Sequence, residues 1–183
     1  MSESAIIPSE EEVKVVKKVI EKKWYAVYTR PRAEKLVCDR VVEMGAEVFL
    51  PLQKTYRIWS DRKKLVIKPL LSSYLFVKTS GKEKGEIVKV AGVVKYISFE
   101  GHAVAIPENQ INNLRLIVNS DARIDVTTEQ FDPGDKVEVM HGALCGLTGE
   151  LIKIGSKSRV IVRIDRLDQN LILKIPKSFL KKT

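Results

Sequence analysis

A glycine-rich segment in the second half of the chain, residues 132–154, limits the folds that this chain can adopt. It reads DPGDKVEVMHGALCGLTGELIKI, and glycines at Gly142, Gly146 and Gly149 follow one short apolar run and precede another. Glycines so placed allow positive φ angles or a close approach of two backbones, which tight loops between strands require. No catalytic group lies among them, so the segment predicts a binding surface built on short strands.

The residues after this segment continue the pattern of short strands. From residue 131 onward the apolar pattern predicts only strands, at 136–140, 147–154, 158–166 and 170–176. That spacing is typical of a small β-barrel, so residues 131–183 are predicted to form a C-terminal domain. Residues 119–130 are polar and lack sustained periodicity, and we expect them to be a linker.

The chain before the linker alternates strands with helices. We expect strands at 24–29, 46–53, 70–78 and 93–99, and helices at 32–44, at 82–91 and from Pro107 to Val118. This order favours an α+β sandwich over residues 24–118, in which helices cover one face of the sheet and leave the other open for a partner. Residues 54–68 carry six basic residues and are expected to form an exposed hairpin or loop that turns at Ser60-Asp61.

The first 23 residues form a charged extension. Ser9 and Glu12 make a capping-box pattern at the start of 9–23. A thin apolar stripe follows, made of Val13, Val16, Val19 and Ile20. One interpretation is a solvated or frayed extension, and the other is a helix that docks on its own domain or on a partner.

Charge and cysteine content restrict the partners and the compartment. The net charge is +9, and residues 1–120 hold 21 Lys+Arg against 14 Asp+Glu, which suggests a polyanion such as nucleic acid nearby. No apolar run approaches the ~20 residues of a membrane span. Cys38 and Cys145 form neither a metal-ligand pattern nor a disulfide framework. We therefore expect a cytoplasmic protein with no membrane contact, and a monomer.

The sequence lacks the groups that an enzyme needs. The two histidines, His102 and His141, fall in different predicted domains, and there is no Cys-x-x-Cys, no phosphate-binding loop and no carboxylate cluster. His141 is interpreted as a turn residue. We expect no catalytic activity, no metal and no cofactor.

Three segments in order resemble the NusG family of transcription elongation factors. They are Trp24-Tyr25-x-Val27-Tyr28, the stretch Pro69-Leu70-Leu71-x-x-Tyr74-Leu75-Phe76-Val77, and the glycine-rich segment, which resembles a KOW motif. The FLPLQ and WSDRKK stretches are most similar to the specialised RfaH and UpxY-type paralogues. The resemblance implies an N-terminal NusG-like α/β sandwich plus a C-terminal SH3-like KOW barrel. It also implies an antitermination factor that suppresses pausing or termination on selected operons.

The resemblance also implies specific contacts in the N-terminal domain. Tyr28, Leu71, Tyr74 and Phe76 match positions that bind the clamp helices of the RNA polymerase largest subunit. Tyr74 and Phe76 lie two apart on one strand and therefore point to one face, with Leu75 and Val77 toward the helices. The alternative places Tyr74 and Phe76 in the core. The family's usual Phe-Pro-Gly-Tyr reads Leu71-Ser72-Ser73-Tyr74 here, so affinity for the clamp is expected to differ.

Basic residues open or flank the first predicted helix, namely Arg30, Arg32, Lys35 and Arg40. Lysine and arginine can meet phosphates, and arginine can stack on exposed bases. The resemblance implies that these residues contact the non-template DNA strand. The alternative is an ordinary solvated helix face. The run at 54–68 allows the same two interpretations.

The KOW-like loop is the candidate site for a second partner. Leu144 and Leu147 offer an apolar tip where the family usually has Gly-Pro-Phe, and ribosomal protein S10 and Rho are the candidates that the resemblance implies. An alternative function for the whole chain is a ribosome-associated RNA-binding KOW protein. The Trp24–Tyr28 and Tyr74–Val77 motifs argue against it, because ribosomal KOW proteins do not need them.

Overall fold

The computed structural model describes residues 21–58, 62–120, 122–154 and 157–183. Most of the helix expected over 9–23, and the whole of the turn expected at Ser60-Asp61, lie outside these ranges. None of the helices in the described ranges is long and apolar enough to cross a membrane.

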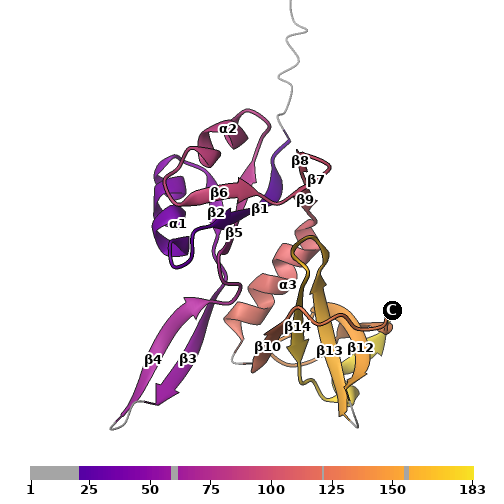
Figure 1. Ribbon diagram of the computed structural model, residues 1–183. Coiled ribbons are helices and arrows are strands. Elements are labelled where there is room, and N and C mark those ends of the chain that lie inside the picture. Colours follow the sequence, from indigo (N-terminus) through magenta and orange to yellow (C-terminus); the bar gives the residue numbers. More distant parts are fainter. Residues whose placement is uncertain (1–20, 59–61, 121, 155–156) are drawn as a thin grey trace, which may run out of the picture.

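An antiparallel sheet forms the centre of the N-terminal part (Figure 1). Its strands are β1 (Lys23–Thr29), β2 (Glu47–Phe49), β5 (Tyr74–Thr79), β6 (Val93–Tyr96) and β9 (Ala105–Ile106). They lie in the order β2-β5-β1-β6, and β9 also pairs with β1. The aromatic and β-branched residues of β1 suit this central position, because a central strand is covered on both faces.

Two helices cover one face of this N-terminal sheet, as predicted. They are α1 (Glu34–Glu43) and α2 (Glu83–Val88). Val37 and Val41 of α1 and Ile87 of α2 share a hydrophobic cluster with Leu75 and Val77. The prediction that Leu75 and Val77 face the helices is therefore confirmed.

The opposite face is also covered, which corrects the expectation of an open face. Helix α3 (Glu108–Asn119) starts after Pro107, as predicted. Its buried residues Ile111, Leu114 and Ile117 share one cluster with Trp24 and Phe76 of the N-terminal sheet and with residues of the C-terminal sheet. Helix α3 thus lies between the two sheets (Figure 1).

Two hairpins extend from the N-terminal part. The longer one pairs β3 (Leu52–Ile58) with β4 (Lys63–Pro69) and projects away from the body of the molecule (Figure 1). The shorter one pairs β7 (Ser98–Phe99) with β8 (His102–Ala103). The predicted exposed hairpin at 54–68 is confirmed.

The C-terminal part is a second antiparallel sheet with the order β10-β14-β13-β12-β11-β15. Its elements are β10 (Ile124–Thr127), β11 (Asp135–Val139), β12 (Thr148–Ile154), β13 (Lys157–Ile164), β14 (Gln169–Leu173), β15 (Leu180–Lys182) and the short 3-10 helices η1 (Asp165–Leu167) and η2 (Lys177–Phe179). Gly142 and Gly146 have φ angles of 83° and 85°. A Cβ on Gly149 would lie 2.6 Å from the Ile161 carbonyl oxygen. The glycine pattern thus has the role that the sequence predicts.

Several predicted bounds differ from the observed ones, and two of the differences change the fold. The expected linker at 119–130 contains β10, which pairs with β14 at the edge of the C-terminal sheet. Only Ile124 of this strand is buried. One buried residue shows no alternation of apolar and polar positions, so the sequence pattern does not indicate a strand here. The expected strand at 70–78 begins only at Tyr74, because Ser73 has a φ of 65° and belongs to a turn. The division into domains at 24–118 and 131–183 stays a prediction.

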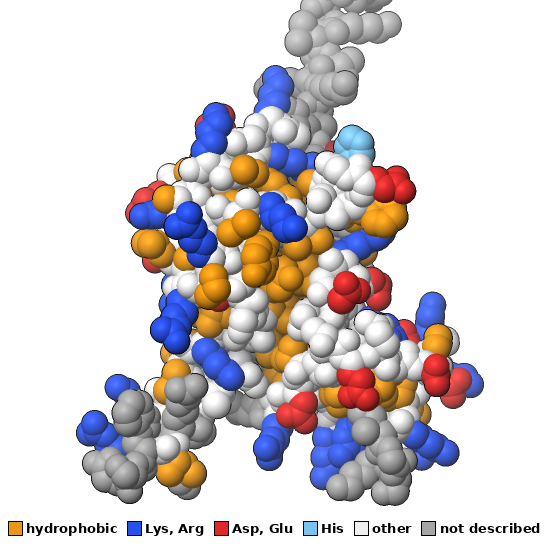
Figure 2. All heavy atoms as spheres, in the orientation of Figure 1, with side chains coloured by type: hydrophobic (Ala, Val, Ile, Leu, Met, Phe, Trp, Pro, Cys, Tyr) orange, Lys and Arg blue, Asp and Glu red, His pale blue; other side chains and the backbone are white. Residues whose placement is uncertain are grey.

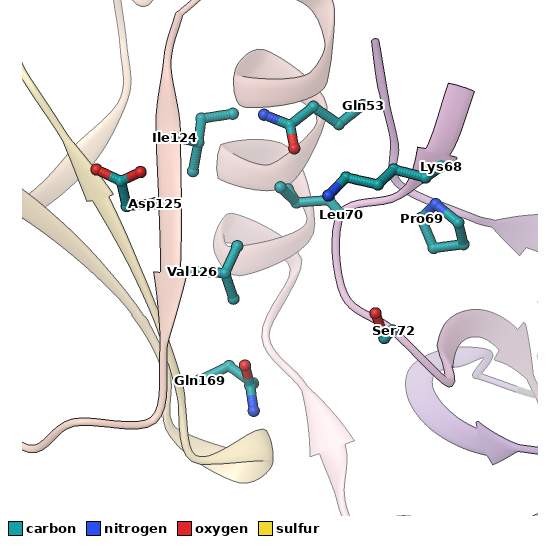
Figure 3. Close-up of a pocket in the computed structure, with 9 residues that line it drawn as sticks. All are labelled: Gln53, Lys68, Pro69, Leu70, Ser72, Ile124, Asp125, Val126 and Gln169. Atoms are coloured by element: carbon teal, nitrogen blue, oxygen red, sulfur yellow. The ribbon is translucent and has the colours of Figure 1, made fainter. Parts of the chain in front are cut away.

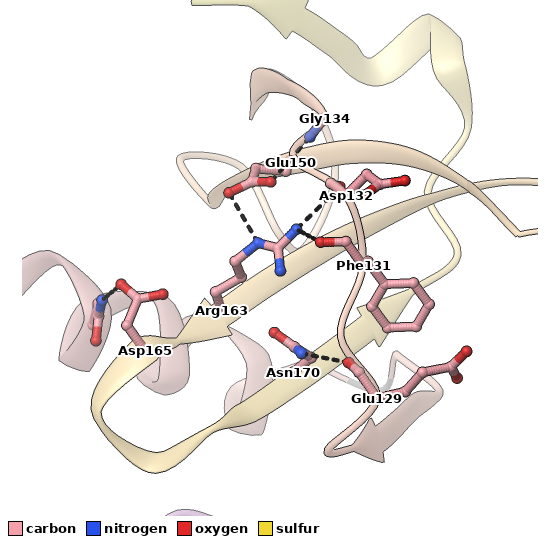
Figure 4. Close-up of polar contacts among 9 residues, drawn as sticks. Glu129, Phe131, Asp132, Gly134, Glu150, Arg163, Asp165 and Asn170 are labelled. Carbon is pink, nitrogen blue, oxygen red and sulfur yellow. Dashed lines mark hydrogen bonds and ion pairs between the residues drawn. The ribbon is translucent and has the colours of Figure 1, made fainter.

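A network of hydrogen bonds around Arg163 and Glu150, called the polar strap here, holds the chain segment that leads into β11 (Figure 4). Arg163 donates from Nε to Glu150 at 3.1 Å and from Nη2 to the carbonyl oxygens of Phe131 and Asp132 at 3.0 and 3.2 Å. Burial alone would raise the pKa of Glu150, but the Arg163 side chain and the Gly134 N–H bind the carboxylate and lower it overall. The strap therefore depends on an ionised Glu150.

A carboxylate also fastens the start of α2. Glu83 accepts hydrogen bonds from Ser80 N at 2.8 Å, from the Thr79 and Ser80 hydroxyls at 3.1 Å each, and from Lys22 Nζ at 2.7 Å. The Lys22 side chain and then the Ser80 N–H hold the pKa of Glu83 at about 2, against an ordinary value of 4.5.

We predict that Glu83→Gln removes a pH-dependent part of the stability. The folded pKa is lowered, so the contribution is fully present above the ordinary value of 4.5 and is lost as pH falls toward about 2. The difference in the free energy of unfolding between the wild type and Glu83→Gln should shrink over that range in urea titrations. Glu86→Gln, at an exposed i,i+3 pair with Lys89, is the control. Parallel curves for wild type and Glu83→Gln would contradict the prediction.

Candidate functional site

Two tyrosines form a pair at one end of the N-terminal sheet. Tyr28 and Tyr74 are directly opposite in the β1–β5 ladder, and their ring centroids are 5.3 Å apart. Both side chains are half-buried. Burial raises the pKa of the Tyr74 hydroxyl, and Tyr28 and Asp168 of the C-terminal part raise it further. The pair therefore lies at the edge of the contact between the two parts.

The other two predicted polymerase-binding residues are inside the molecule. Phe76 is 0 % exposed and stacks on Phe49 with centroids 6.1 Å apart, and Leu71 is 1 % exposed. Both belong to the cluster that contains α3 and the C-terminal sheet. The expectation of an exposed Tyr74–Phe76 pair is wrong for Phe76 in this conformation, because α3 and the C-terminal sheet pack on that side of the N-terminal sheet.

The turn between Leu71 and Tyr74 is tied to its surroundings on both sides. The carbonyl oxygen of Ser73 accepts a hydrogen bond from Thr29 N at 2.9 Å, and Ser73 N donates to Glu34 Oε1 at 2.7 Å. Ser73 adopts the left-handed conformation, with a φ of 65°. Sequence reasoning missed Glu34, and an acidic residue in the first turn of an otherwise basic helix start was the available signal.

The basic residues before and within α1 divide into two groups. Arg30, Arg32 and Lys35 are exposed at the start of the helix, and Lys35 Nζ lies 3.4 Å from the carbonyl oxygen of Ile67 in β4. Arg40 is half-buried and donates to the carbonyl oxygen of Ala91 at 2.6 Å. The structure therefore brings three of the four DNA-binding candidates together and gives Arg40 a structural contact.

The helix start and the hairpin form one basic side of the molecule. Exposed lysines Lys54, Lys64 and Lys68 belong to the hairpin, whose base is next to Lys35. Figure 2 shows Lys and Arg side chains along the side that carries α1 and the hairpin, and a band of hydrophobic side chains between the N-terminal part and the C-terminal sheet. A strip of positive charge thus borders an apolar seam.

The two candidate residues for a second partner are covered in this conformation. Leu144 is 8 % exposed and Leu147 is 0 % exposed, and both lie in the cluster shared with α3, Leu71 and Phe76. The two predicted partner-binding surfaces therefore contribute to the same buried cluster. The sequence had indicated an exposed apolar tip because it contains no information on what packs against the loop.

Two polar contacts join α3 to the C-terminal part, and Asn113 makes the more buried one. Asn113 of α3 donates from Nδ2 to the Thr148 carbonyl oxygen at 3.0 Å and accepts from Thr148 N at 3.2 Å. Asn113 is 6 % exposed, and Gln110 also donates to Asp165 at 3.3 Å. Because Asn113 satisfies both backbone groups of one residue, it fixes where the C-terminal sheet sits on the helix. An asparagine inside an apolar helix stripe was the sequence signal.

A cavity of about 460 Å³ lies between the base of the β3–β4 hairpin and strand β10. Figure 3 shows Gln53, Lys68 and Leu70 on one side of it and Asp125 and Val126 on the other. The two parts therefore meet closely around α3 and separate toward the hairpin. Within the residues that the structure describes, no group of three or more His, Cys, Asp or Glu side chains is arranged to hold a metal ion.

The N-terminal part determines the family. Residues 22–115, from β1 into α3, match the family described as "Transcription termination factor nusG". The chain belongs to the NusG family. NusG-family members are transcription termination and antitermination factors rather than enzymes, which agrees with the absence of catalytic motifs from the sequence.

Individual relatives agree with this assignment. The chain is similar to the transcription termination/antitermination protein NusG of Rickettsia typhi, with 23 % identity over 157 residues that cover 78 % of this chain and 82 % of that protein. NusG of Chlamydia pneumoniae is 22 % identical over 154 residues, which cover 78 % and 84 % of the two chains. A solved structure titled "Domain interaction in Thermotoga maritima NusG" has a TM-score of 0.52 at 19 % identity and covers 88 % of this chain and 97 % of that one. The last similarity supports a NusG-like fold.

We predict that Asn113→Ala loosens the contact between α3 and the C-terminal sheet. The substitution leaves both backbone groups of Thr148 without their partner, which costs about 1–3 kcal/mol. NMR relaxation should give one rotational correlation time for the wild type and separate, shorter times for the two parts of the variant. Asn112→Ala, at an exposed position of the same helix, is the control. Equal correlation times in wild type and Asn113→Ala would show that Asn113 does not hold the C-terminal sheet on α3.

Proposed function

We propose that this NusG-family chain is an antitermination factor that binds the clamp helices of the RNA polymerase largest subunit. Tyr28, Leu71, Tyr74 and Phe76 form the proposed binding face. The observation that supports it most is the Tyr28–Tyr74 pair, because Tyr74 packs against the apolar cluster that contains Leu71 and Phe76. Large aromatic side chains next to an apolar pocket are the usual anchors for a partner helix. The specialised RfaH and UpxY-like paralogues are the proposed branch of the family.

The described arrangement is proposed to be a resting state. Leu71 and Phe76 are covered by the cluster that includes Leu144 and Leu147, so neither proposed partner can reach its full surface. Separation of the C-terminal sheet from α3 would uncover Leu144 and Leu147, and Phe76 would be uncovered only if α3 also left the N-terminal sheet. If only a fraction of molecules is open, the apparent dissociation constant for polymerase rises by the inverse of that fraction.

The C-terminal sheet is proposed to be an SH3-like KOW domain that recruits a second protein once it is released. Its glycine loop supports this proposal, since Gly142 and Gly146 shape the turn that presents Leu144. Ribosomal protein S10 and Rho remain the candidates. The ribosome-associated alternative is less well supported, because the family match falls on the N-terminal part.

Arg30, Arg32 and Lys35 are proposed to hold the non-template DNA strand while polymerase is bound. They are exposed, lie together at the start of α1 and adjoin the basic hairpin. Arginine can pair with phosphate and stack on an unpaired base, which suits an exposed single strand.

We predict that Tyr74→Ala weakens binding to purified core RNA polymerase by at least about tenfold, as removal of an interface anchor commonly does. The measurement should be repeated in the Asn113→Ala background. The Asn113→Ala variant with Tyr74 in place should bind polymerase more tightly than the wild type does. Phe76 is a poor choice, since removal of so deeply buried a ring costs about 3–5 kcal/mol of stability. Phe99→Ala, which removes an exposed aromatic on β7, is the control. An unchanged affinity for Tyr74→Ala in both backgrounds would refute the binding face.

We predict that Arg30→Ala combined with Arg32→Ala lowers the salt dependence of binding to a single-stranded oligonucleotide. Each lost phosphate contact reduces the slope of log K against log salt by about 0.7. The slope should therefore fall by about 1.4 in fluorescence anisotropy titrations. Lys177→Ala with Lys181→Ala, at exposed positions of the C-terminal part, is the matched control. The same slope for both double variants would show that Arg30 and Arg32 do not contact the oligonucleotide and belong to an ordinary solvated helix face.

A further inference from the structure

A carboxylate is buried directly behind the proposed polymerase-binding face. Glu34, in the first turn of α1, is 5 % exposed, and its Oε1 accepts a hydrogen bond from Ser73 N at 2.7 Å. Among the described residues Glu34 forms no ion pair with lysine or arginine. A buried carboxylate without a cation is costly, so its place at this position needs a specific compensating role.

The hydrogen bond from Ser73 gives Glu34 that role. Ser73 has a φ of 65°, a conformation that a residue with a Cβ adopts only when its surroundings impose it. The Glu34 carboxylate holds the N–H of Ser73, and Thr29 N holds its carbonyl oxygen at 2.9 Å. The next residue along the chain is Tyr74. Ser73, the residue before Tyr74, is thus held at both its N–H and its carbonyl oxygen.

The same two hydrogen bonds set the geometry of the tyrosine pair. Thr29 directly follows Tyr28 in β1, and Ser73 directly precedes Tyr74 in β5. The link from Thr29 to Ser73 therefore extends the β1–β5 ladder by one step beyond the Tyr28–Tyr74 pair. Glu34, which belongs to α1, accepts the hydrogen bond from Ser73 N and so links this extra step of the ladder to the helix.

We infer that Glu34 is a positioning residue for the polymerase-binding face, an inference that rests on the proposed function. Glu34 does not touch the partner and acts through Ser73 on Tyr74. It also joins the turn to the helix start that carries Arg30, Arg32 and Lys35. Glu34 therefore adds a side-chain link, besides the Thr29–Ser73 backbone hydrogen bond, between the proposed polymerase-binding turn and the proposed DNA-binding residues.

Two conservative substitutions of Glu34 distinguish the effect of side-chain length from the effect of the negative charge. Glu34→Gln keeps an acceptor oxygen at the same distance and removes the charge. Glu34→Asp keeps the charge at the helix N-terminus and withdraws the carboxylate by one methylene. A positioning role needs the reach, whereas a role for charge at the helix dipole would need only the carboxylate.

The test measures three quantities on the full chain. They are the chemical shift and hydrogen exchange of the Ser73 amide, the melting temperature, and the affinity for purified core RNA polymerase. Glu34→Gln should stay within about threefold of wild type in affinity, and Glu34→Asp should lose about tenfold with a shifted, faster-exchanging Ser73 amide. Adding Ser73→Gly to Glu34→Asp should restore part of the affinity, because glycine adopts positive φ readily.

A stability control and the wild type separate the outcomes. Ile87→Val loosens the buried α2 side of the sheet and should lower the melting temperature without a loss of affinity. The inference is overturned if Glu34→Asp binds polymerase like Ile87→Val, or if Gln is the weaker of the two Glu34 variants. If wild type itself fails to bind polymerase, the proposed function is lost. The Ser73 amide then still decides whether Glu34 sets the turn.

Discussion

The hydrophobic core that surrounds α3 is the constraint on which the other features depend. Ile111, Leu114 and Ile117 are fully buried in a cluster that includes both sheets. The cluster contains residues of both sheets, so the helix has apolar partners on two sides. The N-terminal sheet provides one, through Trp24 and Phe76, and the C-terminal sheet provides the other. The exposure of most candidate site residues follows from this arrangement.

This shared core has a direct functional consequence for a NusG-family protein. The apolar residues proposed to bind polymerase and those proposed to bind a second protein lie in the same cluster. Apolar packing supplies most of the attraction between the two parts, because burial of apolar surface is non-directional and scales with area. Asn113 adds direction, since its amide fits only one backbone position on the C-terminal sheet. The Tyr28–Tyr74 pair stays half-exposed at the edge, where a partner can meet it first.

Sequence patterns predicted elements whose signals are local. Strand β1, helix α1 and helix α3 follow from aromatic alternation, from Val37 and Val41 at helical spacing, and from Pro107 at a helix start. Strand β10 was missed because four edge residues with one buried side chain show no period. The turn before Tyr74 was missed because Ser73 adopts a positive φ that only its contacts with Glu34 and Thr29 explain.

The sequence by itself determined the two kinds of fold in the chain, the glycine loop, the basic N-terminal surface and the family. These properties depend on neighbouring residues or on motifs that stay together along the chain. Only the tertiary structure decided that Phe76, Leu71 and Leu147 are buried together, and that Asn113 and Glu34 are held by backbone groups 35 and 39 residues away. The physical reason is that burial and hydrogen-bond partners depend on which distant segments meet, and periodicity along one strand or helix contains no record of that meeting.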